Sequence, residues 1–128
     1  MKNYKAVAPD SWSEKYTYSP AVRLNNLVFL SGTTATDDAG NLVGPGDIVA
    51  QTRRIFEKFD DLLRREGGSL ANIVETTDYF LSLDDYRKTA GVRREMLKGP
   101  PWPAATGVVV SGLIRPGALI EIKATAAL

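Results

Sequence analysis

The sequence contains no cysteine and no histidine, and these two absences exclude much of the chemistry that proteins commonly use. Without a thiol or an imidazole, the chain has no disulfide bond, no zinc site built from Cys or His, and no cysteine nucleophile. A Ser-His triad and a histidine general base are excluded for the same reason. Any catalysis must therefore use carboxylates, hydroxyl groups, Lys, Arg or backbone groups, and we expect no metal and no other cofactor.

An excess of charge of one sign is also missing. The chain carries 16 Lys and Arg against 15 Asp and Glu, so its formal net charge is +1. This balance gives no extended field that would attract nucleic acid or an anionic membrane, and we expect neither partner. No window approaches the roughly 20 apolar residues of a membrane span, and the first residues do not resemble a signal peptide. We therefore predict a cytoplasmic protein.

The composition is that of a globular domain. Of the 128 residues, 44% are hydrophobic and 24% are charged, which provides enough apolar side chains for a core. No segment repeats at a fixed period, and no linker rich in Pro, Gly or Ser divides the chain. We therefore expect residues 1–128 to form a single domain.

Turn-forming residues divide the chain into strands and helices. The pair Asn25-Asn26 predicts a tight turn between two short apolar strands, the second of which ends at Ser31-Gly32. Asp47 is the expected N-cap of an amphipathic helix that ends at Gly67-Gly68. The prolines of segment 99–103 predict a rigid loop. The resulting order is ββαβαββ, with strands at 21–24, 27–30, 73–81, 106–111 and 119–126 and helices starting at 48 and at 83, the second reaching about 97.

This order predicts an α+β fold in which two helices cover one face of a sheet. The strands at 106–111 and 119–126 are apolar at almost every position, which is typical of strands buried on both faces. Because two helices cover only one face, the other face needs a partner. A second copy of the chain is the simplest source of that partner.

Glu121 is the first candidate for a functional side chain, because it interrupts the last apolar strand between Ile120 and Ile122. One reading is a charge that faces solvent at a sheet edge. The other is a partly buried carboxylate that orients and activates water. The strand alone does not separate these two readings.

Other candidates also have two readings each. The loop 99–103 leads into small residues that let a ligand approach the backbone, but a plain rigid connector explains the same residues. Trp102 within this loop is a pocket wall or an interface anchor. Arg93, on the second helix, belongs to a solvated face or contacts a ligand. Tyr18 and Ser31 flank the predicted hairpin, where packing and turn roles are the alternatives to binding.

Several motifs occur in the order and spacing of one protein family. Taken together, the chain resembles the Rid family, the reactive intermediate deaminases, which are also called YjgF-like proteins. The resemblance covers nearly the whole sequence. The matching motifs are Tyr18 to Val22, Asn26 to Gly32, Gln51 to Phe56, Val74 to Tyr79, Pro103 to Thr106 and Ile120 to Ala124.

The resemblance implies a chorismate-mutase-like α+β subunit that assembles as a homotrimer. The sheets of such a trimer form an inner barrel, and three clefts lie between neighbouring subunits. Members with the best-known activity hydrolyse enamines and imines to a 2-oxo acid and ammonia, without metal or cofactor. This chemistry suits a chain without Cys and His, because an imine already has an electrophilic carbon and needs mainly a placed water.

The chain departs from the family pattern at the residue that would bind the substrate carboxylate. The family motif reads Pro-Ala-Arg-Ser/Thr, and its Arg holds that carboxylate bidentately, whereas Ala105 stands at this position here. A frequent cleft Asn and a frequent Cys correspond to Ala90 and Gly107. Loss of the Arg contact implies carboxylate binding weaker by orders of magnitude, unless Arg93 or Arg94 replaces it.

These observations lead to the hypothesis of a small-molecule hydrolase that adds water to an imine, an enamine or a related activated carbon of a non-standard substrate. Glu121 is assigned as the catalytic base or water-positioning residue, and backbone N–H groups near Gly107 as the electrophilic site. The alternative is a non-catalytic homotrimer that binds a small metabolite in the same clefts. The predicted substrate-binding residues are Tyr18, Ser31, Arg93, Trp102, Ala105, Thr106 and Gly107.

Overall fold

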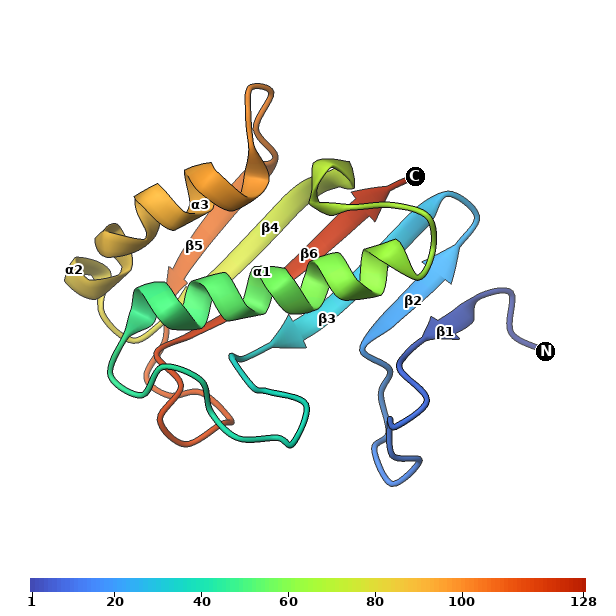
Figure 1. Cartoon of the computed structure of the whole chain (residues 1–128), viewed down its shortest axis with the longest axis horizontal. Helices are drawn as coiled ribbons and strands as arrows, with labels where there is room; N and C mark the ends of the chain where they lie inside the picture. Colours follow the sequence, from blue (N-terminus) through green and yellow to red (C-terminus); the bar gives the residue numbers. More distant parts are fainter.

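The computed structural model describes residues 1–128 and contains one mixed sheet with helices on one of its faces (Figure 1). The six strands lie in the order β1-β2-β3-β6-β4-β5. All neighbouring strands are antiparallel except β4 and β5, which are parallel. The predicted α+β class is confirmed. The strands are β1 (Lys5–Val7), β2 (Ala21–Leu24), β3 (Leu27–Thr33), β4 (Ile73–Phe80), β5 (Ala104–Val109) and β6 (Ile120–Ala127), and the helices are α1 (Ile48–Arg64), η1 (Leu70–Asn72), α2 (Leu83–Tyr86), η2 (Arg87–Thr89) and α3 (Ala90–Leu97).

The hairpin of β2 and β3 forms where the sequence predicts it. Asn25 adopts a left-handed conformation with a φ of 54°, which asparagine tolerates better than most residues. β3 then pairs with β6, and the register shifts between Leu30 and Thr33. Such a shift re-aims the side chains of a strand locally. This irregular part of β3 contains Ser31 and Gly32, which belong to the candidate site.

Helix α1 provides much of the core. Asp47 caps it as predicted, because its side chain accepts a hydrogen bond from the backbone N–H of Ala50 at 3.0 Å. One stripe of the helix, which includes Ile55, Phe56 and Phe59, is fully buried against the sheet. Helices α1 and α3 contact each other and cover the same face of the sheet (Figure 1). The buried apolar side chains of α1, β3, β4 and β6 belong to one hydrophobic cluster.

The predicted helix at 83–97 is interrupted in the structure. α2 is capped by Ser82, whose side chain accepts a hydrogen bond from the backbone N–H of Asp85, and η2 separates α2 from α3. Thr89 is buried, and its hydroxyl donates to the carbonyl of Tyr86 at 2.8 Å. Because this local bond competes with regular helix geometry, the segment tightens to a 3₁₀ turn here. The prediction of one continuous helix is therefore wrong, although both of its ends are right.

The two faces of the sheet differ in burial. In β6, Ile120 and Ile122 are buried beneath the helices, whereas Lys123 is exposed on the opposite face. Strand β5 is exposed at all six of its positions, and Val109 is 58% exposed. In the single chain the helices thus cover only one face of β6, as the sequence predicts, and β5 is exposed on both faces. Within one chain no helix covers the other face of the sheet, and no strand pairs with the outer edge of β5.

Two further details of the strands differ from the prediction. β5 occupies 104–109 instead of 106–111, because its small first residues pair with Glu75 and Thr76 of β4. β1 is absent from the predicted order, and it pairs with β2. Its three residues are too few to show a strand pattern in the sequence.

Candidate functional site

Glu121 lies on the helix-free face of the sheet, over the neighbouring strand β3. A Cβ atom at Gly32 would lie only 2.7 Å from Oε2 of Glu121, so the carboxylate occupies the space that a side chain at residue 32 would fill. Burial raises the pKa of the Glu121 carboxyl, and no nearby charge or hydrogen bond opposes this shift. Glu121 is therefore a half-buried carboxylate without a partner, and it is a stronger base than a solvated glutamate.

Tyr18 lies close enough to Glu121 for their charges to interact. Burial raises the pKa of the Tyr18 hydroxyl, with smaller contributions from Tyr16 and Glu121, so that this group is protonated at neutral pH and can donate a hydrogen bond. The Tyr18 ring packs against the rings of Trp12 and Tyr16, with centroid distances of 5.3 and 5.8 Å. These contacts hold the Tyr18 ring in place.

Ser31 connects the Tyr18 segment to the sheet. Its hydroxyl donates to the carbonyl of Ser19 at 2.6 Å, which holds the chain before β2 against β3. Tyr18 and Ser31 also line a hollow of about 540 Å³, together with Tyr4 and Tyr16. We infer that Ser31 positions Tyr18 beside this hollow.

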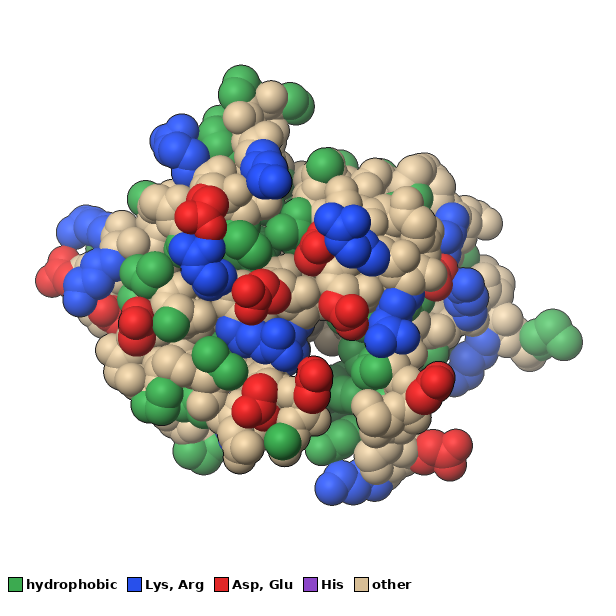
Figure 2. Space-filling view, in the orientation of Figure 1, with side chains coloured by type: hydrophobic (Ala, Val, Ile, Leu, Met, Phe, Trp, Pro, Cys, Tyr) green, Lys and Arg blue, Asp and Glu red, His purple; other side chains and the backbone are tan.

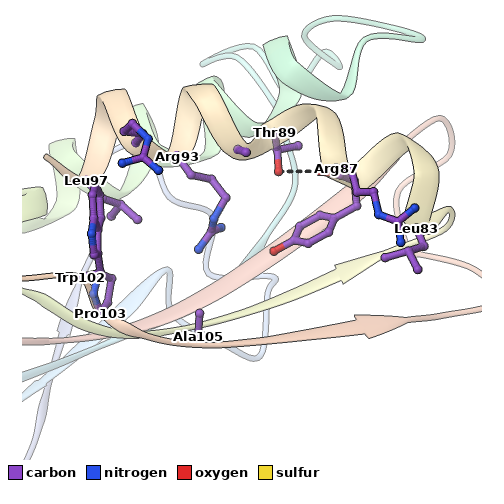
Figure 3. A pocket seen from close by; sticks show the side chains of 11 residues that line it. Leu83, Arg87, Thr89, Arg93, Leu97, Trp102, Pro103 and Ala105 are labelled. Carbon is purple, nitrogen blue, oxygen red and sulfur yellow. Dashed lines mark hydrogen bonds between the residues drawn. The ribbon is translucent and has the colours of Figure 1, made fainter. Parts of the chain in front are cut away.

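A second pocket lies on the helix side of the sheet, between β5 and the segment of α2 and α3 (Figure 3). Its volume is about 530 Å³. Arg93 points from α3 toward Ala105 on β5, and Trp102 and Pro103 lie at one end of the pocket (Figure 3). The methyl group of Ala105 leaves space between the strand and the helix that a ligand can enter.

The guanidinium of Arg93 is anchored to strand β4. It forms an ion pair with Asp78, which is wholly buried, while the Arg93 side chain itself is 16% exposed. A second hydrogen bond reaches Oγ1 of Thr76 at 3.3 Å. Tyr86 donates to Oδ2 of Asp78, the same oxygen that Arg93 contacts, at 2.6 Å. Arg93 is thus part of the pocket and does not belong to a solvated helix face.

Burial has the largest effect on the pKa values of Asp78 and Tyr86 in this cluster. It raises the pKa of Asp78, and the charge of Arg93 and the hydrogen bond from Tyr86 oppose that rise. Burial and Asp78 together raise the pKa of Tyr86 to about 12, so that its hydroxyl remains a donor. The second oxygen of Asp78, Oδ1, is buried and has no hydrogen-bond partner.

Trp102 packs directly on the backbone of its own loop. A Cβ atom at Gly99 would overlap the Trp102 ring, so only glycine permits this contact. The guanidinium of Arg94 lies 5.3 Å from the centre of the ring, within the range of a cation–π contact. Within one chain, Trp102 is therefore a pocket wall.

The sheet separates the predicted site residues into two groups. One group lies at the helix-free face, and the other lines the pocket on the helix side. Residues of β5 alternate between these sides: a Cβ atom at Gly107 would lie 3.2 Å from Phe80, beneath the helices, and Thr106 lies on the opposite side. Tyr18, Ser31, Thr106 and Glu121 belong to the first group, and Arg93, Trp102, Ala105 and Gly107 to the second.

Asp78 and Tyr86 are site residues that the sequence reasoning missed. The sequence does contain a signal for Asp78. Thr76, Asp78 and Phe80 occupy every second position of β4 and share the face that the helices cover. A carboxylate at such a position needs a buried partner. No group of three or more Asp or Glu side chains in the chain is arranged to hold a metal ion.

Comparison with known proteins identifies the family. A family model described as Endoribonuclease L-PSP matches residues 9–128. The 3-aminoacrylate deaminase RutC of Acinetobacter baylyi is 34% identical over 109 residues, which are 85% of each chain. The chain belongs to the Rid family. A solved structure of the Rid family protein YyfA from Yersinia pestis is 29% identical and superposes with a TM-score of 0.85, covering 98% of this chain and 99% of that one.

The resemblance predicted from the motifs is thus confirmed, together with the YjgF-like fold. Another Rid relative, the protein mmf2 of Schizosaccharomyces pombe, is 38% identical over 112 residues, covers 86% of each chain and is named as mitochondrial. No helix of the present chain has the length and apolar composition needed to cross a membrane. The cytoplasmic location of this Rid protein stays a prediction.

The surface over the helices of this Rid protein carries mixed charge. Lys and Arg side chains alternate with Asp and Glu on this face, and no continuous basic area is visible (Figure 2). Several of these charges form ion pairs along α1, such as Arg64 with Asp60 at 2.7 Å. This face therefore offers no electrostatic support for nucleic-acid binding.

Proposed function

We propose that this Rid protein is a small-molecule hydrolase that adds water to an imine or enamine without a metal or cofactor. The observation that carries the proposal is the Glu121 carboxylate, which is half-buried, has a raised pKa and has no partner in the chain. A carboxylate in this state can hold a water molecule and accept its proton. The deaminase activity named for the relative RutC supports the same class of reaction.

The reaction needs only proton transfers around the carbon–nitrogen bond. Water held by Glu121 attacks the imine carbon as the carboxylate takes one proton from the water. Glu121 then passes this proton to the nitrogen, which gives a neutral carbinolamine and restores the carboxylate. The carbon–nitrogen bond then breaks, the hydroxyl proton moves through Glu121 to the leaving nitrogen, and a carbonyl compound and ammonia are released. An enamine first moves a proton from nitrogen to carbon to become the imine. In this scheme the protonated hydroxyl of Tyr18 donates a hydrogen bond to the substrate.

We further propose that the complete cleft forms between two copies of the chain in a homotrimer. The Glu121 group and the Arg93 pocket lie on opposite sides of one sheet, so a single chain cannot bring both groups to one ligand. The exposed strand β5 and the uncovered sheet face support such an assembly. The small-molecule ligand would then contact Glu121 and Tyr18 of one copy and Arg93, Trp102 and Ala105 of the next.

The function is tested by measuring the loss of imines that an amino-acid oxidase or an amine oxidase generates in the assay. We expect the wild type to accelerate this loss, and we expect Ala105→Arg to raise the rate with 2-imino acids by about tenfold, because it adds a carboxylate-binding cation. Glu57→Lys, on the solvent side of α1, serves as a control. If neither protein accelerates hydrolysis while a metabolite binds saturably, the non-catalytic alternative is correct.

The assembly is tested with Val108→Glu, which places a charge on the helix-free side of β5. Val108 pairs with Tyr79, which in turn lies opposite Glu121, so it belongs to the face that a second copy would cover. We expect light scattering to give a trimer mass for the wild type and a monomer mass for the variant, because burial of an unpaired charge is costly. Glu57→Lys should remain trimeric. A trimer mass for Val108→Glu would contradict the proposed interface.

A further inference from the structure

Asp78 carries a charge that the proposed mechanism does not use. Its side chain is wholly buried on the helix side of β4, where Oδ2 contacts both Arg93 and the hydroxyl of Tyr86. The other oxygen, Oδ1, is enclosed without a partner. The carboxylate is therefore removed from water, and its charge acts strongly on its surroundings.

Arg93 is consequently a neutralised cation inside the pocket. One of its N–H groups contacts Asp78, another contacts Thr76 at 3.3 Å, and the others remain free. A ligand carboxylate that binds Arg93 would also lie near the charge of Asp78, and this repulsion offsets the attraction. A neutral carbonyl oxygen avoids the repulsion and still accepts a hydrogen bond from the guanidinium.

Two other cations line the pocket, and both are more exposed than Arg93. Arg87 pairs with Asp84 at 3.1 Å, with both side chains largely in solvent. Arg94 is exposed and lies over the Trp102 ring. Because water and salt screen such charges, they discriminate weakly between a neutral and an anionic ligand. The ionic state of the pocket is therefore set mainly by Arg93 and Asp78.

We propose that Asp78 determines the ligand class of this pocket: by holding Arg93 in a buried ion pair, it favours a neutral ligand with a carbonyl oxygen over a carboxylate. This inference deepens the proposed function and rests on it for the reaction. For a hydrolase, the substrate is then an imine or enamine that bears an amide, ester or ketone at this end in place of a free carboxylate.

Benzamide and benzoate are suitable probes, because they have nearly the same shape and differ in charge. In calorimetric titrations of the intact chain, we expect the wild type to bind benzamide at least about fivefold more tightly than benzoate. Asp78→Asn removes the charge and keeps the shape of the side chain. It should therefore raise the affinity for benzoate about tenfold and change the affinity for benzamide by less than about twofold. The double variant Asp78→Asn with Arg93→Met should lose the gain, because the gain requires a free guanidinium.

Several results would overturn the proposal. Equal affinity of the wild type for both probes is one, and an unchanged benzoate affinity in Asp78→Asn is another. If Arg94→Gln instead of Arg93→Met removes the gain in the Asp78→Asn background, Arg94 is the deciding cation and the proposal is wrong. None of these measurements requires turnover, so a failure of the proposed hydrolysis would be seen separately.

A second variant covers the case in which Asp78→Asn does not fold, as judged by circular dichroism. Ala105→Arg lies on the exposed strand β5 and adds to the pocket a second guanidinium, beside the Arg93 group that Asp78 already holds. Its affinity for benzoate should be about tenfold higher than that of the wild type, and its affinity for benzamide should change little. An equal gain for both probes would contradict the role of charge in this pocket.

Discussion

Glu121→Gln is expected to lower the rate of imine hydrolysis by about 10²- to 10⁴-fold, the range typical for loss of a general base. Glutamine has nearly the same shape as glutamate and can still contact water, but it cannot accept a proton. The change affects a carboxylate without hydrogen-bond or ionic partners in the chain, so the fold should be unaffected. The imine assay measures kcat/KM, and circular dichroism and thermal unfolding check the fold.

The pH dependence of the rate gives an independent test of the same residue. Glu121 must be ionised to act as a base, and burial raises its pKa above the ordinary value of 4.5. The value of kcat/KM should therefore rise as the pH increases through this raised pKa and should level off above it. This acid limb should be absent in Glu121→Gln and unchanged in the surface control Glu57→Gln. An unaltered limb in Glu121→Gln would assign the titration to another group.

Arg93→Met is expected to lower the free energy of unfolding by about 3–5 kcal/mol, because it leaves the buried charge of Asp78 without its partner. Methionine keeps much of the apolar volume of the arginine side chain, so the loss reports mainly on the charge. Urea denaturation measures the effect. The neighbouring Arg94→Met, at an exposed position, should change the free energy by less than about 1 kcal/mol.

A double variant and a pH series separate this charge effect from simple loss of packing. Asp78→Val combined with Arg93→Met removes both charges and should recover most of the lost stability. In Arg93→Met alone, the pKa of Asp78 rises further, because the opposing charge of Arg93 is lost. The folded protein then binds a proton that the unfolded chain releases, so the deficit should shrink from about pH 8 to about pH 5. A deficit that is constant over this range would argue for a packing defect.

Local patterns in the sequence were sufficient to predict those features that depend only on residues close together in the chain. The cap at Asp47, the turn at Asn25 and the end of the second helix at Leu97 all follow from short-range rules. The break in the second helix does not, because it depends on the burial of Thr89 against neighbouring elements. Contacts with other elements therefore override the local helical pattern at this break in the helix.

The candidate site was predictable in its residue types and only partly in its arrangement. Glu121 stands out because it interrupts an apolar strand, and Ala105 stands out against the family motif. Asp78 has the same kind of signal, but its partner Arg93 lies on another element, and sequence spacing gives no distance between them. The side of the sheet that each residue of β5 faces depends on its register with β4, which no short motif encodes.

The open edge of strand β5 affects the newly synthesised subunit before it assembles with other copies. It ends the sheet, so the N–H and C=O groups of its outer edge have no strand to pair with, and Val109 beside them is 58% exposed. An open edge with apolar side chains invites the addition of strands from other chains, which is a route to aggregation. Whatever covers β5 therefore protects the newly made subunit from misassembly, and in the proposed trimer the same contact would complete the cleft.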